Sequence, residues 1–354
     1  MKAKKIFSAI MLTIYIVAIY WVLSMLTDKP LIPIVTAAAS ILFTTVVHEL
    51  GHLIAGLLTG YRFVSYRIFS VMLTKTEGKW QIRKYSLPGT GGQCLMAPPR
   101  KKNGYYPFAL YNLGGIILCG YLSFFIMISS FFVSNSAAQP LLFLFGCVSF
   151  YLNAINAIPT KGKSMVNDAT NLRMALKSDA ARLALWNQLE YVSLHAQNVR
   201  TADMPEELFF MPEKKELSNP LLLWQILANV EREEDRGNYE KAREIISFTL
   251  DHAPHIFPLY KSVLQCEAIY LDCILKADSV DADEYYEKLQ KIPALRNLIS
   301  FHRASYAYLL LRKQDSAAAE KALSDFQRKI KTAPYAAEAK FEQNQLAYIQ
   351  QIKD

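Results

Sequence analysis

Acidic residues are scarce in the first half of this 354-residue chain. Up to residue 180 there are 5 Asp and Glu against 17 Lys and Arg, whereas the remainder has 26 against 22. Cysteine is also sparse, with five in all, and shows neither the spacing of a zinc site nor a disulfide framework. Charged residues make up 20 % and apolar residues 52 % of the chain, which excludes a disordered tail, a collagen-like repeat and a disulfide-stapled miniprotein. The two halves are therefore expected to lie in different solvents.

Long apolar runs fill the first half. Four of them occur, at residues 6–27, 31–60, 107–133 and 141–159. Each is about as long as a helix that crosses a bilayer. A signal peptide is the alternative for the first run, but its apolar core would be shorter, and no small-residue cleavage site precedes Asp28. The sequence predicts a mainly α chain with a membrane-embedded core of about four spanning helices.

Basic residues mark one side of these predicted spans. They precede the first run, follow the fourth, and crowd the segment 61–106, which holds nine of them and one acid, Glu77. Because Lys and Arg are retained in the cytoplasm during insertion, we expect both termini to be cytoplasmic in an integral protein, most simply of a bacterial cell membrane. Topology accounts for the positive charge, so we expect contact with the lipid bilayer and no nucleic-acid partner.

Two further elements are expected outside the spans. Residues 63–85 are rich in β-branched and aromatic residues around a Thr-Glu-Gly turn, which predicts a β-hairpin at the membrane surface. From residue 178 on, amphipathic helices with a Gly237-Asn238 turn follow the order of a tetratricopeptide repeat. We therefore divide the chain into a membrane domain, 1–177, and a soluble α-solenoid, 178–354. Such a solenoid would offer a curved face to a cytosolic protein partner; the alternative is a helical bundle without one.

The second apolar run contains the motif His-Glu-x-x-His, formed by His48, Glu49 and His52. Two histidines four residues apart lie on one face of a helix, so both can bind one tetrahedral zinc ion. The carboxylate of Glu49 would lie beside the metal and take a proton from a zinc-bound water molecule. Ionisable groups carry a burial penalty in an apolar helix, and three within five positions indicate a functional site.

A catalytic zinc ion normally has a third protein ligand. Asp168 is the only carboxylate between Glu77 and Asp179, and the predicted topology places it on the same side of the membrane as the end of the second span. We therefore predict that Asp168 completes the site.

Together these residues resemble the site-2 protease type of intramembrane zinc metallopeptidase. His48, Glu49 and His52 match its first motif, and Asp168 takes the place of its aspartate ligand, although Ala169 stands where the family has glycine. Two weaker similarities concern substrate binding. Asn156 resembles the asparagine that precedes a proline in the family's later helix, and Asn112, before Gly114 and Gly115, resembles that of its middle helix.

The resemblance implies hydrolysis of a peptide bond in a membrane-spanning or membrane-inserted substrate. Members act on signal-peptide remnants, peptide precursors and anti-sigma factors, with Zn²⁺ as cofactor. Asn156 would then help to place the peptide or the developing oxyanion. The competing interpretation is a membrane adaptor without enzymatic activity that binds a partner through its helical repeats. Such an adaptor has no need of the Glu49 carboxylate.

Overall fold

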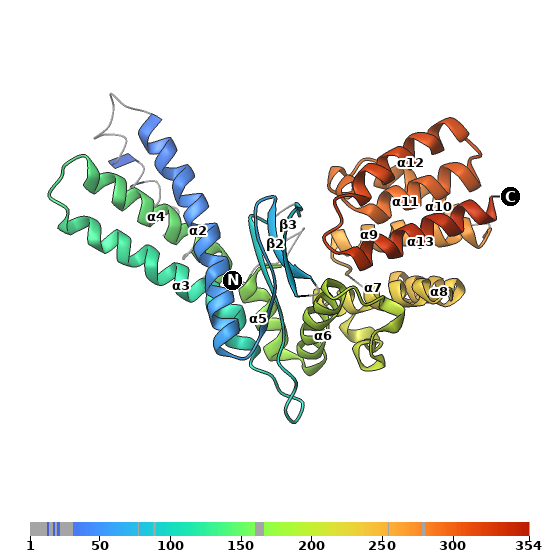
Figure 1. Ribbon diagram of the computed structural model, residues 1–354, viewed down its shortest axis with the longest axis horizontal. Coiled ribbons are helices and arrows are strands. Elements are labelled where there is room, and N and C mark those ends of the chain that lie inside the picture. Colours follow the sequence, from blue (N-terminus) through green and yellow to red (C-terminus); the bar gives the residue numbers. More distant parts are fainter. Residues whose placement is uncertain are drawn as a thin grey trace.

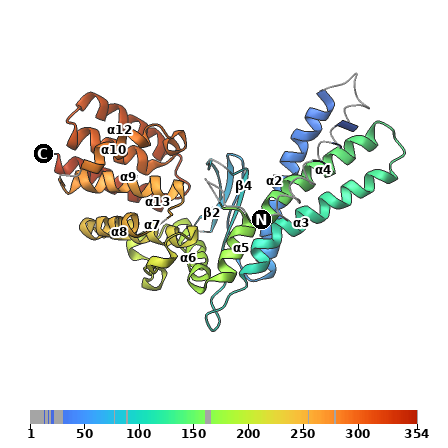
Figure 2. The same cartoon turned by 180° about the vertical axis from the view of Figure 1, so that it is seen from behind.

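The computed structural model describes residues 13, 17, 20, 21, 31–76, 78–87, 90–159, 166–253, 255–277 and 280–353. In this part the chain is mainly helical, with one small antiparallel sheet. Figure 1 shows long apolar helices at one end, a bundle of shorter helices at the other, and the sheet between them. Helices α5 (Asp168–Lys177) and α6 (Asp179–Ala196) lie below the sheet in this view and link the two ends of the molecule, as the view from behind also shows (Figure 2).

Three helices are long and apolar enough to cross a bilayer, which makes this a candidate membrane protein. They are α2 (Leu31–Leu58), α3 (Phe108–Ser129, continued by a 3-10 turn at Ser130–Phe132) and α4 (Ala138–Ala157). These match three of the four predicted spans within a few residues. The predicted span over 6–27 lies outside the described residues, apart from four of its positions.

Helices α2 and α3 approach each other through glycine. A Cβ atom on Gly114 would lie 2.4 Å from the carbonyl oxygen of Gly51 and 2.6 Å from the Cβ of Ala55. Small residues at a crossing allow two backbones to come this close inside a membrane, where burial of apolar surface does not drive helix association.

The sheet has four strands in the order β3-β2-β1-β4, all antiparallel. They are β1 (Arg62–Ile68), β2 (Val71–Thr76), β3 (Lys79–Lys84) and β4 (Gly92–Ala97). The predicted single hairpin over 63–85 is therefore corrected to three strands joined by two turns, with a fourth strand added. The first turn was missed because its residues, Phe69 and Ser70, continue an apolar run, yet Phe69 adopts φ +50° and its N–H donates to the carbonyl oxygen of Gly91 at 2.7 Å.

The remainder of the chain is helical. Helices α5 (Asp168–Lys177) and α6 (Asp179–Ala196) are followed by three short 3-10 turns, then by α7 (Pro220–Asp235), α8 (Tyr239–His252), α9 (Pro258–Ile274), α10 (Val280–Leu289), α11 (Ile299–Ala307), α12 (Ser316–Ile330) and α13 (Ala336–Ile352). The turn between α7 and α8 contains Gly237, at φ +78°, and Asn238, where the repeat pattern places it. Helix α13, however, packs back onto α6, α7 and α11. In an open solenoid each repeat would contact only its neighbours.

The proposed domain boundary at residues 177 and 178 falls inside a shared core. Helix α5 ends at Lys177, and Ser178 caps α6 by accepting a hydrogen bond from the N–H of Ala181 at 3.1 Å. One buried cluster joins side chains from both sides of this boundary, namely Tyr61, Cys94, Met96, Tyr106, Phe108, Tyr111, Ala175, Ala181, Ala184, Leu185, Leu189, Leu221 and Leu222. The sheet and the first helices of the C-terminal half therefore form one packed unit.

Because the core is shared, a cavity in α6 is expected to destabilise the sheet as well as the C-terminal helices. Leu185→Ala removes a side chain that is 4 % exposed and should lower the free energy of unfolding by about 2–5 kcal/mol. Leu176→Ala, on the exposed side of α5, is the matched control and should change it little. Thermal unfolding in detergent, followed by far-UV circular dichroism, measures both. Equal midpoints for the two variants would contradict the shared core.

Candidate metal centre

His48 and His52 lie one turn apart on α2 and face the interior of the helical core. Their side chains are buried, and the two ring centroids are 4.8 Å apart with the planes nearly perpendicular. The spacing of four residues therefore brings the Nε2 atoms to 3.2 Å from each other.

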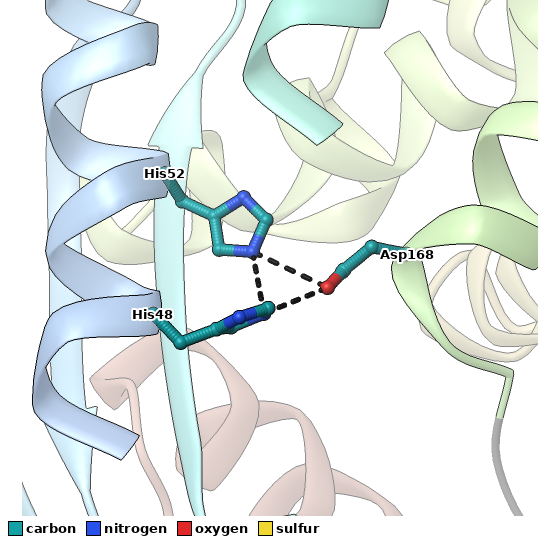
Figure 3. Close-up of side chains that lie close together, drawn as sticks. All are labelled: His48, His52 and Asp168. Carbon is teal, nitrogen blue, oxygen red and sulfur yellow. Dashed lines mark hydrogen bonds and ion pairs between the residues drawn. The ribbon is translucent and has the colours of Figure 1, made fainter. Parts of the chain in front are cut away.

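Asp168, the first residue of α5, completes the cluster (Figure 3). Its Oδ2 atom lies 2.8 Å from Nε2 of His48 and 3.4 Å from Nε2 of His52. The three ligand atoms all lie within 4.8 Å of one another, a grouping that could hold a metal ion. Burial raises the pKa of Asp168, but the neighbouring imidazoles outweigh this effect and hold it below the usual range, so the group is a carboxylate at neutral pH.

The outer nitrogen of each imidazole has a partner that fixes its tautomer. Nδ1 of His52 lies 2.7 Å from the carbonyl oxygen of Tyr111, which can only accept. Nδ1 of His48 lies 3.3 Å from Oδ1 of Asn153, whose amide nitrogen donates to the carbonyl oxygen of Ile116 at 3.0 Å and so directs Oδ1 toward the ring. Both Nδ1 atoms are therefore donors. In the neutral imidazoles each Nε2 then presents a lone pair to the same point as the Asp168 carboxylate, the arrangement that a metal ion needs.

A glycine of α3 leaves room for the two rings. A Cβ atom on Gly115 would lie 2.6 Å from Nε2 of His52 and 2.7 Å from Nε2 of His48, closer than real Cβ contacts. In the sequence, Gly114 and Gly115 were noted only as the residues that follow Asn112 in the segment resembling the family's middle helix. Their closest contacts are instead with α2 and its histidines.

Asn167 holds Asp168 in place, and the sequence analysis missed it. Its Oδ1 atom accepts from the N–H of Thr170 at 3.1 Å and so caps α5. Its amide nitrogen donates to the carbonyl oxygens of Ile155 and Ile158, both at 2.8 Å, at the end of α4. Asparagine directly before a helix is a capping signal that could have identified this residue.

Glu49 is buried against strand β4. A Cβ atom on Gly92 would lie 2.6 Å from Cγ and 2.7 Å from Oε1 of Glu49, so the side chain lies against the backbone of the strand. Two hydrogen bonds near this contact join the sheet to the helices. The hydroxyl of Tyr66, on β1, donates to the carbonyl oxygen of Val46 at 2.7 Å, and the hydroxyl of Tyr111 donates to that of Cys94 at 2.7 Å. The carboxylate therefore lies between the histidine face of α2 and the sheet.

The two asparagines expected to bind substrate lie in different surroundings. Asn112 is buried and donates its amide to the carbonyl oxygen of Phe108 at 2.7 Å, within its own helix. Asn156 is half-buried near the end of α4. The asparagine of α4 that contacts a site residue is Asn153, one turn earlier; a polar residue in an apolar run was the signal available in the sequence.

No family model, curated protein or solved structure was found to match this chain.

The contact of Gly115 with both rings predicts that a single methyl group disrupts metal binding. In Gly115→Ala the new Cβ must displace at least one imidazole, and bound metal should fall well below the wild-type level. Gly91→Ala is the control, because its Cβ would meet only Thr45 at 3.4 Å or more. Metal per chain, measured by mass spectrometry on protein purified in detergent, distinguishes them. Wild-type metal content in Gly115→Ala would show that the ions bind elsewhere.

Asn153 should tune metal affinity without binding the metal. Removal of a partner that orients a histidine ligand lowers metal affinity by about 10- to 100-fold, so Asn153→Ala should release metal to a weaker chelator than the wild type does. Asn156→Ala, three residues along the same helix, should leave metal affinity unchanged. Titration of the metal-loaded protein with a chromophoric chelator measures both. Equal affinities in the two variants would remove Asn153 from the site.

Proposed function

We propose that this protein is a membrane-embedded zinc metallopeptidase that resembles the site-2 protease type. The observation that carries the proposal is the convergence of two imidazole nitrogens and one carboxylate oxygen on a point beside the buried Glu49. Three protein ligands with a further position for a small molecule are typical of catalytic zinc. Zinc is proposed because His-Glu-x-x-His on a helix, with a carboxylate as the third ligand, is the ligand pattern of zinc peptidases.

Each group of the site has a separate proposed role. Bound zinc would supply Lewis acidity at the scissile carbonyl group. Glu49 would accept a proton from the attacking water molecule and deliver it to the leaving amine, for which it must stay near the metal without binding it. Its close approach to Gly92 keeps it on the side of α2 that faces the sheet. We retain Asn156, and more weakly Asn112, as proposed substrate contacts.

The location of the motif favours a membrane-inserted substrate. His48 and His52 lie in the last part of α2, a helix apolar enough to cross a bilayer, and an exposed cleft for soluble proteins would need a more polar setting. We propose a peptide or protein inserted in the membrane, such as a signal-peptide remnant, a peptide precursor or an anti-sigma factor. Cleavage would occur near its cytoplasmic end in a bacterial membrane, with both termini of the enzyme in the cytoplasm. The C-terminal half, 178–354, would bind a cytosolic partner as a tetratricopeptide-like unit.

Metal analysis of four proteins tests the ligand set. The wild type should hold about one zinc ion per chain, and His48→Ala and Asp168→Ala should lose or weaken it. Asp179→Ala, at the exposed start of α6, should bind as the wild type does. Zinc unaffected by Asp168→Ala would move the third ligand elsewhere.

Glu49→Gln separates the enzyme from the adaptor. Because Glu49 is not a ligand, this variant should keep its zinc but lose cleavage by orders of magnitude, and membrane-inserted peptides should accumulate in cells that carry it. Quantitative mass spectrometry of membrane peptides measures the accumulation, with Glu213→Gln as an exposed control. Unchanged membrane peptides in Glu49→Gln cells, together with absence of zinc from the wild type, would support the non-enzymatic adaptor.

A further inference from the structure

A second cavity lies apart from the metal centre, between the sheet and the C-terminal helices. Its volume is about 470 Å³, within the range of small-molecule and peptide side-chain pockets. Strands β2 and β4 contribute one wall, and helices α6, α7, α9, α11 and α13 contribute the others. None of the proposed metal ligands lines it.

The wall of this cavity is rich in carboxyl groups. Five glutamate side chains line it, those of Glu231, Glu234, Glu267, Glu338 and Glu342. Among the lining residues in the described part of the chain, Arg303 is the only arginine or lysine. It donates to Glu267 and to Glu342, each at 2.8 Å. One guanidinium cannot balance five ionised carboxylates, and because unpaired charge is costly away from bulk water, burial favours the protonated form of the remaining acids.

Burial shifts the pKa values of the titratable groups in this wall toward their neutral forms. Burial lowers the pKa of His195, so its ring is neutral near pH 7. Burial raises the pKa of Glu338 to about 8 and that of Glu342 to about 7 although Arg303 opposes it, and burial with the neighbouring Glu267 raises the pKa of Glu234 well above its usual range. These acids therefore gain full charge at neutral pH only when another cation accompanies them.

Two buried polar atoms in this wall point to the kind of ligand. Oε1 of Glu234 and Nη1 of Arg303 have no hydrogen-bond partner within the described residues, and both side chains are about 1 % exposed. The carboxyl group of Glu234 would ionise beside a bound cation and accept hydrogen bonds from it, and Nη1 of Arg303 is a donor that suits a carbonyl oxygen. A polyamine or a metal ion would satisfy only the acceptor. A peptide with a basic side chain offers both a cation and backbone carbonyl groups.

Most of the other lining residues are apolar or aromatic. Trp224 and Leu227 of α7, Tyr260 of α9 and Phe341 of α13 face the cavity. They suit the aliphatic stem of lysine or arginine and an adjacent apolar side chain, and aromatic rings also attract cations.

We propose that this cavity binds a short peptide segment in which lysine or arginine stands beside apolar residues. Strand β4 joins this cavity to the metal centre, since Gln93 and Leu95 line the cavity while Gly92 touches Glu49. Membrane peptides carry such basic segments at their cytoplasmic flank. We further propose, on the basis of the proposed function, that the bound segment is the basic flank of the substrate that is cleaved.

Peptide binding is measured on the full chain in detergent with Glu49→Gln, so that no cleavage is needed. The probe is a fluorescent peptide of alternating leucine and lysine, and fluorescence anisotropy gives the affinity. Glu338→Gln, an isosteric change that removes one charge from the cavity, should weaken binding about five- to tenfold. Glu320→Gln, exposed on α12, should have no effect. Unchanged metal content shows that both variants are folded.

Three results would overturn the peptide site. The first is equal binding of a peptide with glutamate in place of lysine, and the second is equal weakening by Glu320→Gln. The third is tight binding of spermidine without binding of the peptide, which would assign the cavity to a free polyamine. The link to cleavage is tested separately with Glu49 intact. A KM unchanged by Glu338→Gln would reject the link alone, and a wild type without peptidase activity would reject the proposed function while leaving the binding result in force.

Discussion

Three electron-pair donors, two imidazole nitrogens and one carboxylate oxygen, meet at one point inside an apolar helical core, and much of the surrounding structure serves to keep them there. The Nε2 atoms of His48 and His52 and the Oδ2 atom of Asp168 lie within 3.4 Å of one another. With both Nδ1 atoms acting as donors, such a group is stable only if a cation occupies the point or an imidazole takes a second proton. Close crossing of α2 and α3 at glycine creates the space for the rings.

The groups that orient these ligands come from every neighbouring element. Helix α3 gives the carbonyl oxygen of Tyr111, helix α4 gives Asn153, and the turn before α5 gives Asn167. Each is a polar group whose bonds are satisfied internally, as an apolar environment requires. Asp168 lies 120 residues from His48 along the chain, so its position depends on Asn167 fastening α5 to the end of α4.

The sequence predicted what depends on local spacing and missed what depends on contacts between elements. The four-residue spacing of His48 and His52 and the length of three apolar helices could be predicted because each follows from helix geometry. Asp168 could be proposed because few carboxylates were available. The turn at Phe69 was hidden by apolar residues on both sides, since its conformation depends on the contact with Gly91. Asn153 was missed, because which asparagine of α4 meets His48 depends on the crossing of α2 and α4. The substrate contact predicted for Asn156 stays a prediction.

Strand β4 is the element that both halves of the molecule share. Successive residues of a strand point to opposite faces, so Gly92 and Met96 meet α2 while Gln93 and Leu95 face the cavity among the C-terminal helices. The same alternation explains why Gly92 must be small, because any side chain there would enter the space of Glu49. The hydroxyls of Tyr66 and Tyr111 fasten β1 and β4 to the helices, so β4 has little freedom to move on its own. The position of Glu49 is therefore set as much by the packing of the sheet against the C-terminal helices as by the helix that carries it.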